Sequence, residues 1–124
     1  MKLKNEIYSI VRKEVAAQKI CYHLSLNAQH IIFQAHFPEE PITPGVCIIQ
    51  IACELLENHL QHRLVLKKIK NVKFLSVISP VTTPEITYTL EKIEKLSEQN
   101  IKANITVGIP DKTFAKISFI VNKC

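Results

Sequence analysis

The chain has 124 residues, of which 47% are hydrophobic and 22% charged, an ordinary composition for a globular protein. This length fits one domain, which we expect to span residues 1–124. The formal net charge is +5, but only 6% of the residues are aromatic and no nucleic-acid-binding motif is present, so nucleic-acid binding is not expected. No apolar run approaches the roughly 18 residues of a membrane span, and no apolar signal-peptide core follows residues 1–6. We therefore expect a cytoplasmic protein without membrane association.

Cysteine and histidine spacing gives no metal site. The chain contains four cysteines, Cys21, Cys47, Cys53 and Cys124. They form no C-x-x-C pair and match no zinc spacing, so we interpret them as small buried hydrophobic residues in a reducing compartment. His59 and His62 could share a helical face, but no third ligand is evident. The sequence therefore predicts no metal and no cofactor.

Taken in chain order, the first elements are two strands and one helix. Residues 7–16 and 19–26 alternate loosely and contain many β-branched or aromatic side chains, which predicts strands. A helix is predicted from just after Pro44-Gly45 to about His62. Its first two and a half turns are apolar nearly all the way round, which is typical of a helix surrounded by other structure. Its second half is polar and is expected to emerge into solvent.

The remainder of the chain is predicted to consist of strands. Residues 70–78 form one expected strand, and residues 86–91 and 101–107 alternate strictly on either side of a turn at 97–100, which predicts a hairpin. A final strand is expected within residues 114–121. Because a helix that is apolar on every side needs a sheet around it, we predict an α+β fold with a curled antiparallel sheet wrapped around one long central helix.

The segment from Ala35 to Val46 carries the chemistry. Three prolines in seven positions stiffen a loop directly before the helix. Gly45 lets the backbone approach closely at the helix start, where free N–H groups and the helix dipole favour an oxygen that gains negative charge. His36 precedes this loop, and an imidazole is suited to proton transfer at neutral pH.

This segment resembles the H-F-P-x-x-P-x-x-P-G-V signature of the 3-hydroxyacyl-ACP dehydratases of type II fatty acid synthesis. The resemblance continues into Ile48-Ile49 and, more faintly, to residues 69–74 and Pro80. It implies a hotdog fold and a homodimer, or a higher oligomer of dimers, with the substrate tunnel between subunits. It also implies acyl carrier protein (ACP) as the partner that carries the substrate, and the lysines from Lys67 to Lys73 would steer this acidic protein.

The resemblance assigns roles to three residues. His36 would remove the C2 proton of the thioester, and the N–H of Gly45 would hold the thioester oxygen. The family places a Glu or Asp fourteen positions after the histidine, where this chain has Gln50. An amide cannot act as a general acid, although it can donate and accept hydrogen bonds. Further residues are predicted to bind substrate, namely Phe37, Pro44, Val46 and Glu54.

Three explanations for Gln50 remain open. Gln50 could orient a water or the substrate hydroxyl while His36 shuttles the proton. Glu54, one turn further along the same face, could reach into the site. Alternatively, the chain could be a weak or inactive subunit that pairs with a competent relative.

The sequence thus predicts a hydro-lyase that converts (3R)-3-hydroxyacyl-ACP to trans-2-enoyl-ACP, in fatty acid synthesis or a related acyl or aryl-polyene pathway. One alternative is a weakly active or non-catalytic hotdog subunit that binds acyl-ACP and pairs with an active dehydratase. A hotdog thioesterase is a third hypothesis. It is less favoured because such enzymes generally use a carboxylate to activate water.

Overall fold

The computed structural model describes residues 2–35 and 40–124. Its strands form a six-stranded antiparallel sheet in the order β1-β2-β4-β5-β6-β3. The elements, in chain order, are β1 (Tyr8–Val15), β2 (Lys19–Leu26), α1 (Ile31–Ala35), α2 (Gly45–Leu60), β3 (Leu64–Phe74), β4 (Glu85–Lys95), β5 (Asn100–Ile109) and β6 (Lys112–Lys123).

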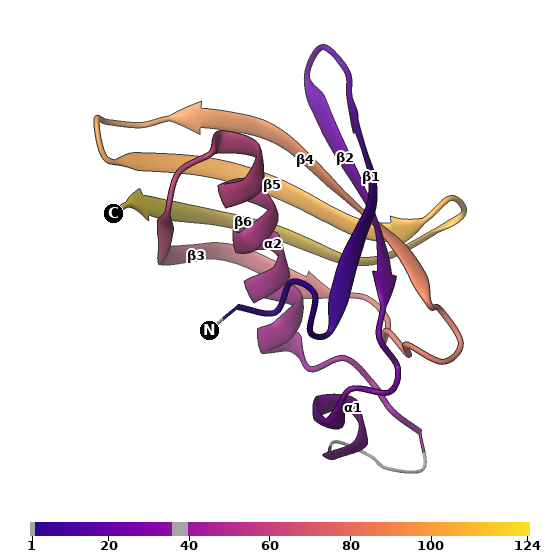
Figure 1. Ribbon diagram of the computed structural model, residues 1–124. Coiled ribbons are helices and arrows are strands. Elements are labelled where there is room, and N and C mark those ends of the chain that lie inside the picture. Colours follow the sequence, from indigo (N-terminus) through magenta and orange to yellow (C-terminus); the bar gives the residue numbers. More distant parts are fainter. Residues whose placement is uncertain (1, 36–39) are drawn as a thin grey trace.

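The helix α2 lies across one face of the sheet, and the sheet curls around it (Figure 1). The strands alternate because one face packs on this helix while the other faces outward. Tyr88, Ile105 and Phe119 are at most 1% exposed and belong to this buried face. A curled antiparallel sheet around one long helix is the hotdog arrangement, so the predicted α+β hotdog fold is confirmed.

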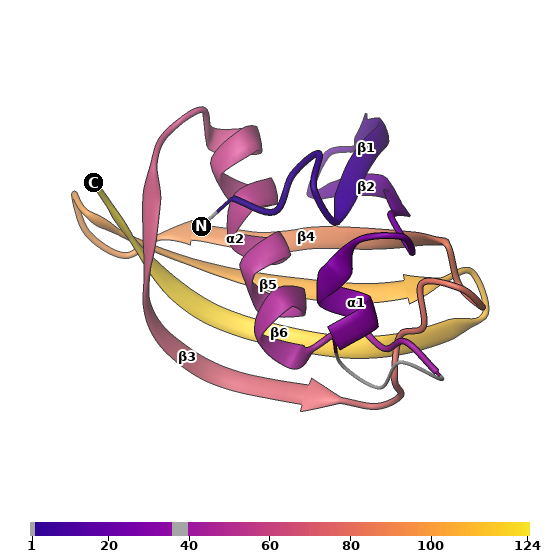
Figure 2. The same ribbon diagram turned by 60° about the horizontal axis from the view of Figure 1, so that its bottom comes forward.

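The strand β3 forms one edge of the sheet, and it was predicted too late in the chain. The expected strand was 70–78, whereas β3 runs from Leu64 to Phe74. Its pairing with β6 shifts between Leu66 and Lys68 and again between Ile69 and Asn71. Such bulges bend a strand, and Figure 2 shows β3 curving along the edge of the sheet below α2.

The other predicted strands match the structure, and β2 begins and ends at the predicted residues. The hairpin of β4 and β5 is confirmed, although both strands extend beyond the alternating segments. The short helix α1 was not predicted. It contains one turn and a fully buried Phe33, and a single turn has too little periodicity to stand out in a sequence.

The long helix α2 begins where predicted and ends at Leu60, followed by Gln61 in the left-handed conformation with φ of 54°. Its second half was expected in solvent, but Glu57 and Asn58 are only partly exposed because the N-terminal segment and β2 contact them. Of the helices in the described ranges, none combines the length and apolar character needed to cross a membrane.

The cysteine prediction holds for two of the four residues. Cys47 and Cys53 are free thiols buried on α2, as expected for small hydrophobic residues. Burial raises the pKa of Cys53 to about 12, so this thiol is not a reactive thiolate. Cys21 is partly exposed, and Cys124 is exposed at the end of the chain, so for these residues the prediction was wrong.

Candidate functional site

The start of α2 exposes backbone donors. Gly45 follows Pro44, whose φ of −61° and ψ of 144° are extended. The carbonyl oxygen of Pro44 accepts the N–H groups of Cys47 and Ile48 at 3.0 and 3.1 Å. The N–H groups of Gly45 and Val46 have no acceptor within the helix, and no described side chain caps this end. With the positive end of the helix dipole, these donors can hold an oxygen that gains negative charge.

Packing against β3 explains why position 45 is a glycine. A β-carbon built on Gly45 would lie 2.9 Å from Cζ and 3.1 Å from Cε2 of Phe74, the last residue of β3. The ring of Phe74 would therefore have to shift to admit a β-carbon at position 45. This contact fixes the end of β3 beside the start of α2.

Gln50 and Glu54 contact each other one turn apart on α2. The Gln50 Nε2 donates to Glu54 Oε2 at 2.9 Å. A carboxylate only accepts hydrogen bonds, so the amide nitrogen of Gln50 must face Glu54 and its carbonyl oxygen must face away from it. In this arrangement the side of Gln50 that points away from Glu54 carries an acceptor and not an acid.

Glu54 is buried at 5% exposure, and four donors surround its carboxylate. Oε2 accepts the N–H of Leu3 at 2.8 Å together with Gln50, while Oε1 accepts the N–H of Lys4 at 2.9 Å and the hydroxyl of Tyr8 at 3.0 Å. Burial, followed by the nearby Glu54 charge, raises the pKa of Tyr8 above its usual range, so its hydroxyl stays a donor. Glu54 thus anchors the N-terminal segment onto α2.

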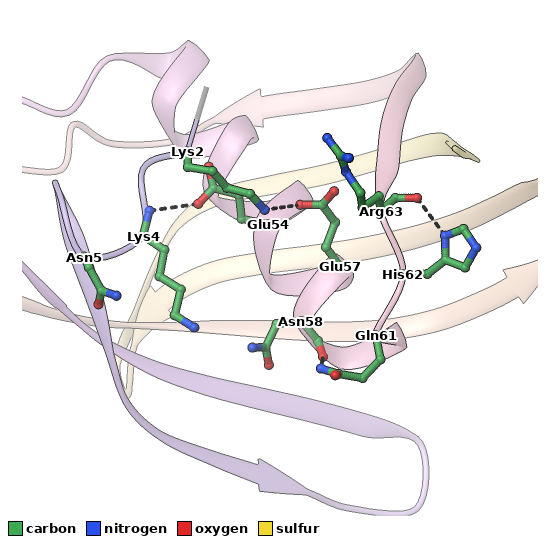
Figure 3. A pocket seen from close by; sticks show the side chains of 9 residues that line it. All are labelled: Lys2, Lys4, Asn5, Glu54, Glu57, Asn58, Gln61, His62 and Arg63. Carbon is green, nitrogen blue, oxygen red and sulfur yellow. Dashed lines mark hydrogen bonds and ion pairs between the residues drawn. The ribbon is translucent and has the colours of Figure 1, made fainter.

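A polar cavity of about 480 Å³ lies between the N-terminal segment and the second half of α2 (Figure 3). Glu57 accepts a hydrogen bond from Lys2 Nζ at 3.0 Å and another from the N–H of Leu64 at 2.8 Å. Lys4 and Arg63 also line this cavity. Glu54 lines it as well, so this predicted residue borders a cavity on a different part of α2 from Gly45.

Two predicted site residues, His36 and Phe37, lie outside the described residues. The other predicted substrate-binding residues of the helix start, Pro44 and Val46, are described, and Val46 is 70% exposed. The structure therefore places Pro44, Gly45 and Val46 together at one end of α2. Gln50 and Glu54 lie further along the same helix and contact each other.

Sequence reasoning missed two residues next to this helix end. Thr43 is 6% exposed, its N–H donates to the Ile78 carbonyl at 2.8 Å, and its hydroxyl has no partner among the described residues. Tyr88 is fully buried, and its hydroxyl donates to the Ile48 carbonyl at 3.0 Å. A threonine in a proline-rich loop and a tyrosine in an alternating strand give no sequence signal for these contacts.

Within the described residues, no three His, Cys, Asp or Glu side chains gather in a way that could hold a metal ion. His59 is partly buried at the end of α2, and burial lowers its pKa. His23 contacts the Thr87 hydroxyl at 3.0 Å through Nδ1 and Glu14 at 2.8 Å through Nε2, on three neighbouring strands. These contacts connect His23 to the strands on both sides of β2, so we interpret it as a structural residue of the sheet.

The fold defines this chain as a hotdog protein, and sequence comparison identifies its family. The ApeI-like family, described as ApeI dehydratase, matches residues 12–108. The chain therefore belongs to the ApeI-like family, within the 3-hydroxyacyl-ACP dehydratase group of hotdog proteins.

Two curated relatives are named 3-hydroxyacyl-[acyl-carrier-protein] dehydratase FabZ. The protein from Latilactobacillus sakei is 30% identical over 104 residues, which cover 78% of this chain and 74% of that one. The protein from Fusobacterium nucleatum is 28% identical over 115 residues, which cover 89% of this chain and 79% of that one.

Solved structures share the fold at low sequence identity. The dehydratase heterocomplex ApeI:P from Xenorhabdus doucetiae aligns with a TM-score of 0.68 and 18% identity, covering 91% of this chain and 96% of that one. The thioesterase HI1161 from Haemophilus influenzae aligns with a TM-score of 0.65 and 12% identity, covering 97% and 80%. At these identities the likeness establishes the shared fold alone.

Proposed function

We propose that the chain is a subunit of a dehydratase that removes water from (3R)-3-hydroxyacyl-ACP and forms trans-2-enoyl-ACP. The observation that carries this proposal is the start of α2 at Gly45, which no side chain within residues 2–35 and 40–124 caps and which lies in a segment that the ApeI-like family matches. Fatty acid synthesis or a related acyl or aryl-polyene pathway would use this reaction. The buried free thiols of Cys47 and Cys53 suit a reducing cytoplasm.

The elimination needs a base at C2 and a site for the thioester oxygen. In the proposal, His36 takes the C2 proton, and the electron pair moves toward the thioester carbonyl. The N–H of Gly45 stabilises the charge that develops on the oxygen, as a donor fixed in the first turn of a helix can. The electrons then return to form the C2–C3 double bond as the C3–oxygen bond breaks.

The departing hydroxyl must receive a proton, and Gln50 cannot supply one. Its amide nitrogen faces Glu54 at 2.9 Å. In the proposal, its carbonyl oxygen accepts a hydrogen bond from the substrate hydroxyl or a held water when the substrate binds, in exchange for the partner that Gln50 has in the absence of substrate. We propose that the protonated His36 returns the proton to the leaving oxygen while Gln50 orients that group. One proton thus leaves C2 and departs with the hydroxyl as water.

Glu54 has a positioning role in this proposal. Its buried carboxylate accepts four hydrogen bonds, so reaching toward substrate would cost the contacts to Leu3, Lys4 and Tyr8. By holding the Gln50 amide nitrogen, Glu54 sets which end of that amide points away from Glu54. The alternative in which Glu54 donates the proton is therefore less well supported.

Purified protein incubated with an enoyl thioester of ACP tests the proposal, since the reverse hydration removes the absorbance of the conjugated enoyl group. We expect turnover that falls by about 10²–10⁴-fold in His36→Ala, the usual contribution of a general base. His62→Ala, in which an exposed histidine at the other end of α2 is removed, serves as the matched control and should leave the rate unchanged. Turnover that survives His36→Ala would remove the assignment of the base.

Gln50→Glu should be as active as the parent or faster. The new carboxyl would lie about where the amide now contacts Glu54, and two such neighbours favour sharing one proton, which raises the pKa at position 50. A raised pKa keeps the acid form, and the gain should be lost as the pH rises through that pKa. A pH–rate profile of both proteins measures this, and a gain that grows with pH would contradict it.

A second candidate function is that of a weakly active or non-catalytic subunit that binds acyl-ACP beside an active dehydratase. Gln50 favours it, since an amide stands where the family has an acid. The Xenorhabdus protein of the same fold is described as a dehydratase heterocomplex, which offers a precedent for two different chains in one assembly. If the parent alone gives no turnover but Gln50→Glu or an added partner chain restores it, this second function holds.

Thioesterase activity is checked in the same reactions. Hydrolysis of the thioester releases a free thiol, whereas hydration and dehydration leave the thioester intact. A thiol reagent added to the assay should therefore report no thiol above the background rate. Release of thiol that depends on the protein would favour the thioesterase hypothesis.

A further inference from the structure

A second cavity, of about 510 Å³, lies where strands β2 and β4 separate. The antiparallel pairing of these two strands ends at Lys19 and Glu91. Beyond that pair, the hairpin of β1 and β2 continues away from β4 (Figure 1). The cavity is lined by residues 17–20, by His59 at the end of α2 and by residues 91–93. We call it the fork cavity, and none of its residues has a role in the proposed dehydratase reaction.

A β-bulge in β4 shapes one wall of the fork cavity. The pairing of β4 with β5 shifts between Glu91 and Glu94, and Lys92 there has a φ of 52°, in the left-handed region that side chains other than glycine rarely adopt. The bulge leaves Lys92 exposed and brings Ile93 against the core. Strained backbone of this kind is concentrated at functional sites. This wall thus combines an ammonium group with an apolar side chain.

His59 lines the fork cavity from the end of α2. Its Nδ1 is buried and has no hydrogen-bond partner within residues 2–35 and 40–124. Proteins seldom leave a buried polar atom unsatisfied, so this atom in a cavity wall points to a ligand that completes it. Burial, followed by the charge of Lys13, lowers the pKa of His59. The ring is therefore neutral at neutral pH and has one N–H group to donate.

The rim of the fork cavity carries a surplus positive charge. It contains two lysines, Lys19 and Lys92, and one carboxylate, Glu91. Lys19 and Glu91 lie directly opposite each other across the strand pair, where opposite charges compensate each other. Among the ion pairs of the described residues, none includes Lys92. The rim is therefore suited to a ligand with one negative charge.

The inner part of the fork cavity is apolar. Ile20 is 8% exposed, and Ile93 is partly buried against the core. An apolar group bound on these side chains would remove their remaining exposed surface from water, which favours binding. The volume falls in the range of about 300–1,000 Å³ that is usual for small-molecule sites. The cavity thus fits a small molecule with an apolar body and a charged end.

We propose that the fork cavity binds a small monocarboxylic acid with an aliphatic body. The carboxylate would lie between the ammonium group of Lys92 and the imidazole of His59, and the aliphatic body would pack on Ile20 and Ile93. The site is separate from the proposed acyl-thioester site, because His59 and Gly45 lie at opposite ends of α2. A phosphate group is a poorer match, since it carries up to about two charges and no apolar body.

An NMR titration of the ¹⁵N-labelled protein with butanoate, hexanoate and octanoate tests the proposal. We expect saturable shifts in the amide signals of residues 17–20 and 91–93 and in the ring signals of His59. The dissociation constant of hexanoate should be about 1 mM, which is ordinary for a ligand of this size. Each added methylene should tighten binding by about two- to fourfold until the cavity is filled.

Two comparison ligands separate the contributions of charge and apolar body. Hexan-1-ol has the aliphatic body without the charge, and sulfate has charge without the body. Each should bind at least about tenfold more weakly than hexanoate, because each lacks one of the two favourable contributions.

Lys92→Gly separates binding from folding. Glycine adopts the left-handed backbone without strain, so this variant should melt at the temperature of the parent or higher. Its affinity for hexanoate should nevertheless fall by at least about fivefold, because a charged hydrogen-bond donor is lost. His59→Ala should weaken binding by a similar factor. Lys95→Ala is the matched control, since it removes an exposed lysine of the same strand outside the cavity and should leave the affinity unchanged.

Three outcomes would overturn the proposal. Shifts confined to residues 43–50 would place the acid at the start of α2, in the proposed acyl site. Equal affinities for hexan-1-ol and hexanoate would show that the charge plays no part. An unchanged affinity in the folded Lys92→Gly and His59→Ala variants would show that these residues do not form the site. The titration does not depend on turnover, so a failure of the proposed dehydratase activity would not affect its result.

Discussion

At the scale of single residues, Glu54 shows how a side chain acquires a role that its neighbours in the sequence do not suggest. Its partners Leu3, Lys4 and Tyr8 are 51, 50 and 46 positions away. Two of them offer only backbone N–H groups, which nearly every residue has. A glutamate one turn after Gln50 suggested a second acid for the site, whereas its contacts favour an anchor for the N-terminal segment.

Removing this anchor should be costly. Glu54→Ala leaves four donors without their acceptor, and each buried orphan costs roughly 1–3 kcal/mol, so we expect a loss of at least about 3 kcal/mol in the free energy of unfolding. Glu57→Ala is the control on the same helix, because Glu57 accepts two hydrogen bonds from the described residues and one of them comes from an exposed lysine. Its loss should be about 1 kcal/mol. Urea unfolding measures both values, and equal losses would show that the four contacts of Glu54 do not stabilise the fold.

At the scale of elements, the sequence predicted most of the fold because hydrophobic periodicity follows burial. The residues of β4 and β5 alternate strictly because one face of each strand contacts the core. The apolar stretch in α2 is continuous because all faces of that part of the helix contact the core. β3 was misplaced because its exposed lysines and two bulges break the alternation. The site was predicted only in part, since a signature can mark Gly45 but not the distant Phe74 that packs on it.

The packing between β3 and α2 can be tested with one substitution whose effect on stability should change sign when Phe74 is removed. Gly45→Ala should destabilise the parent, because the new β-carbon would lie 2.9 Å from Cζ of Phe74. In a Phe74→Ala background the clash is gone, and the higher helix propensity of alanine should make the same change stabilising by up to about 1 kcal/mol. Thermal melts of the parent, Gly45→Ala, Phe74→Ala and the double variant complete a double-mutant cycle. A change of the same sign in both backgrounds would mean that the Phe74 ring is not what excludes a side chain at position 45.

At the scale of the whole molecule, the residues of the proposed chemistry lie at two different places along α2. Gly45 and the end of β3 lie side by side, while Gln50 contacts Glu54 and the N-terminal segment one to two turns further along α2. The resemblance to the dehydratases implies a substrate tunnel between subunits, so we expect position 50 of one chain to serve His36 of the other. Co-expression of two differently tagged copies makes that arrangement testable, since purification on both tags isolates pairs that hold two different chains.

Two mixed pairs with the same substitutions in different chains decide whether the site spans the seam. In the first pair, an unchanged chain supplies His36, and its partner carries His36→Ala and Gln50→Glu. In the second pair, Gln50→Glu is moved to the chain that keeps His36, and its partner carries only His36→Ala. Each pair therefore holds one imidazole and one acid. If they meet across the seam, the first pair should be faster by at least about tenfold, a modest share of what a general acid usually contributes. A faster second pair would place both groups in one chain, and equal rates would mean that position 50 does not reach the substrate from either chain.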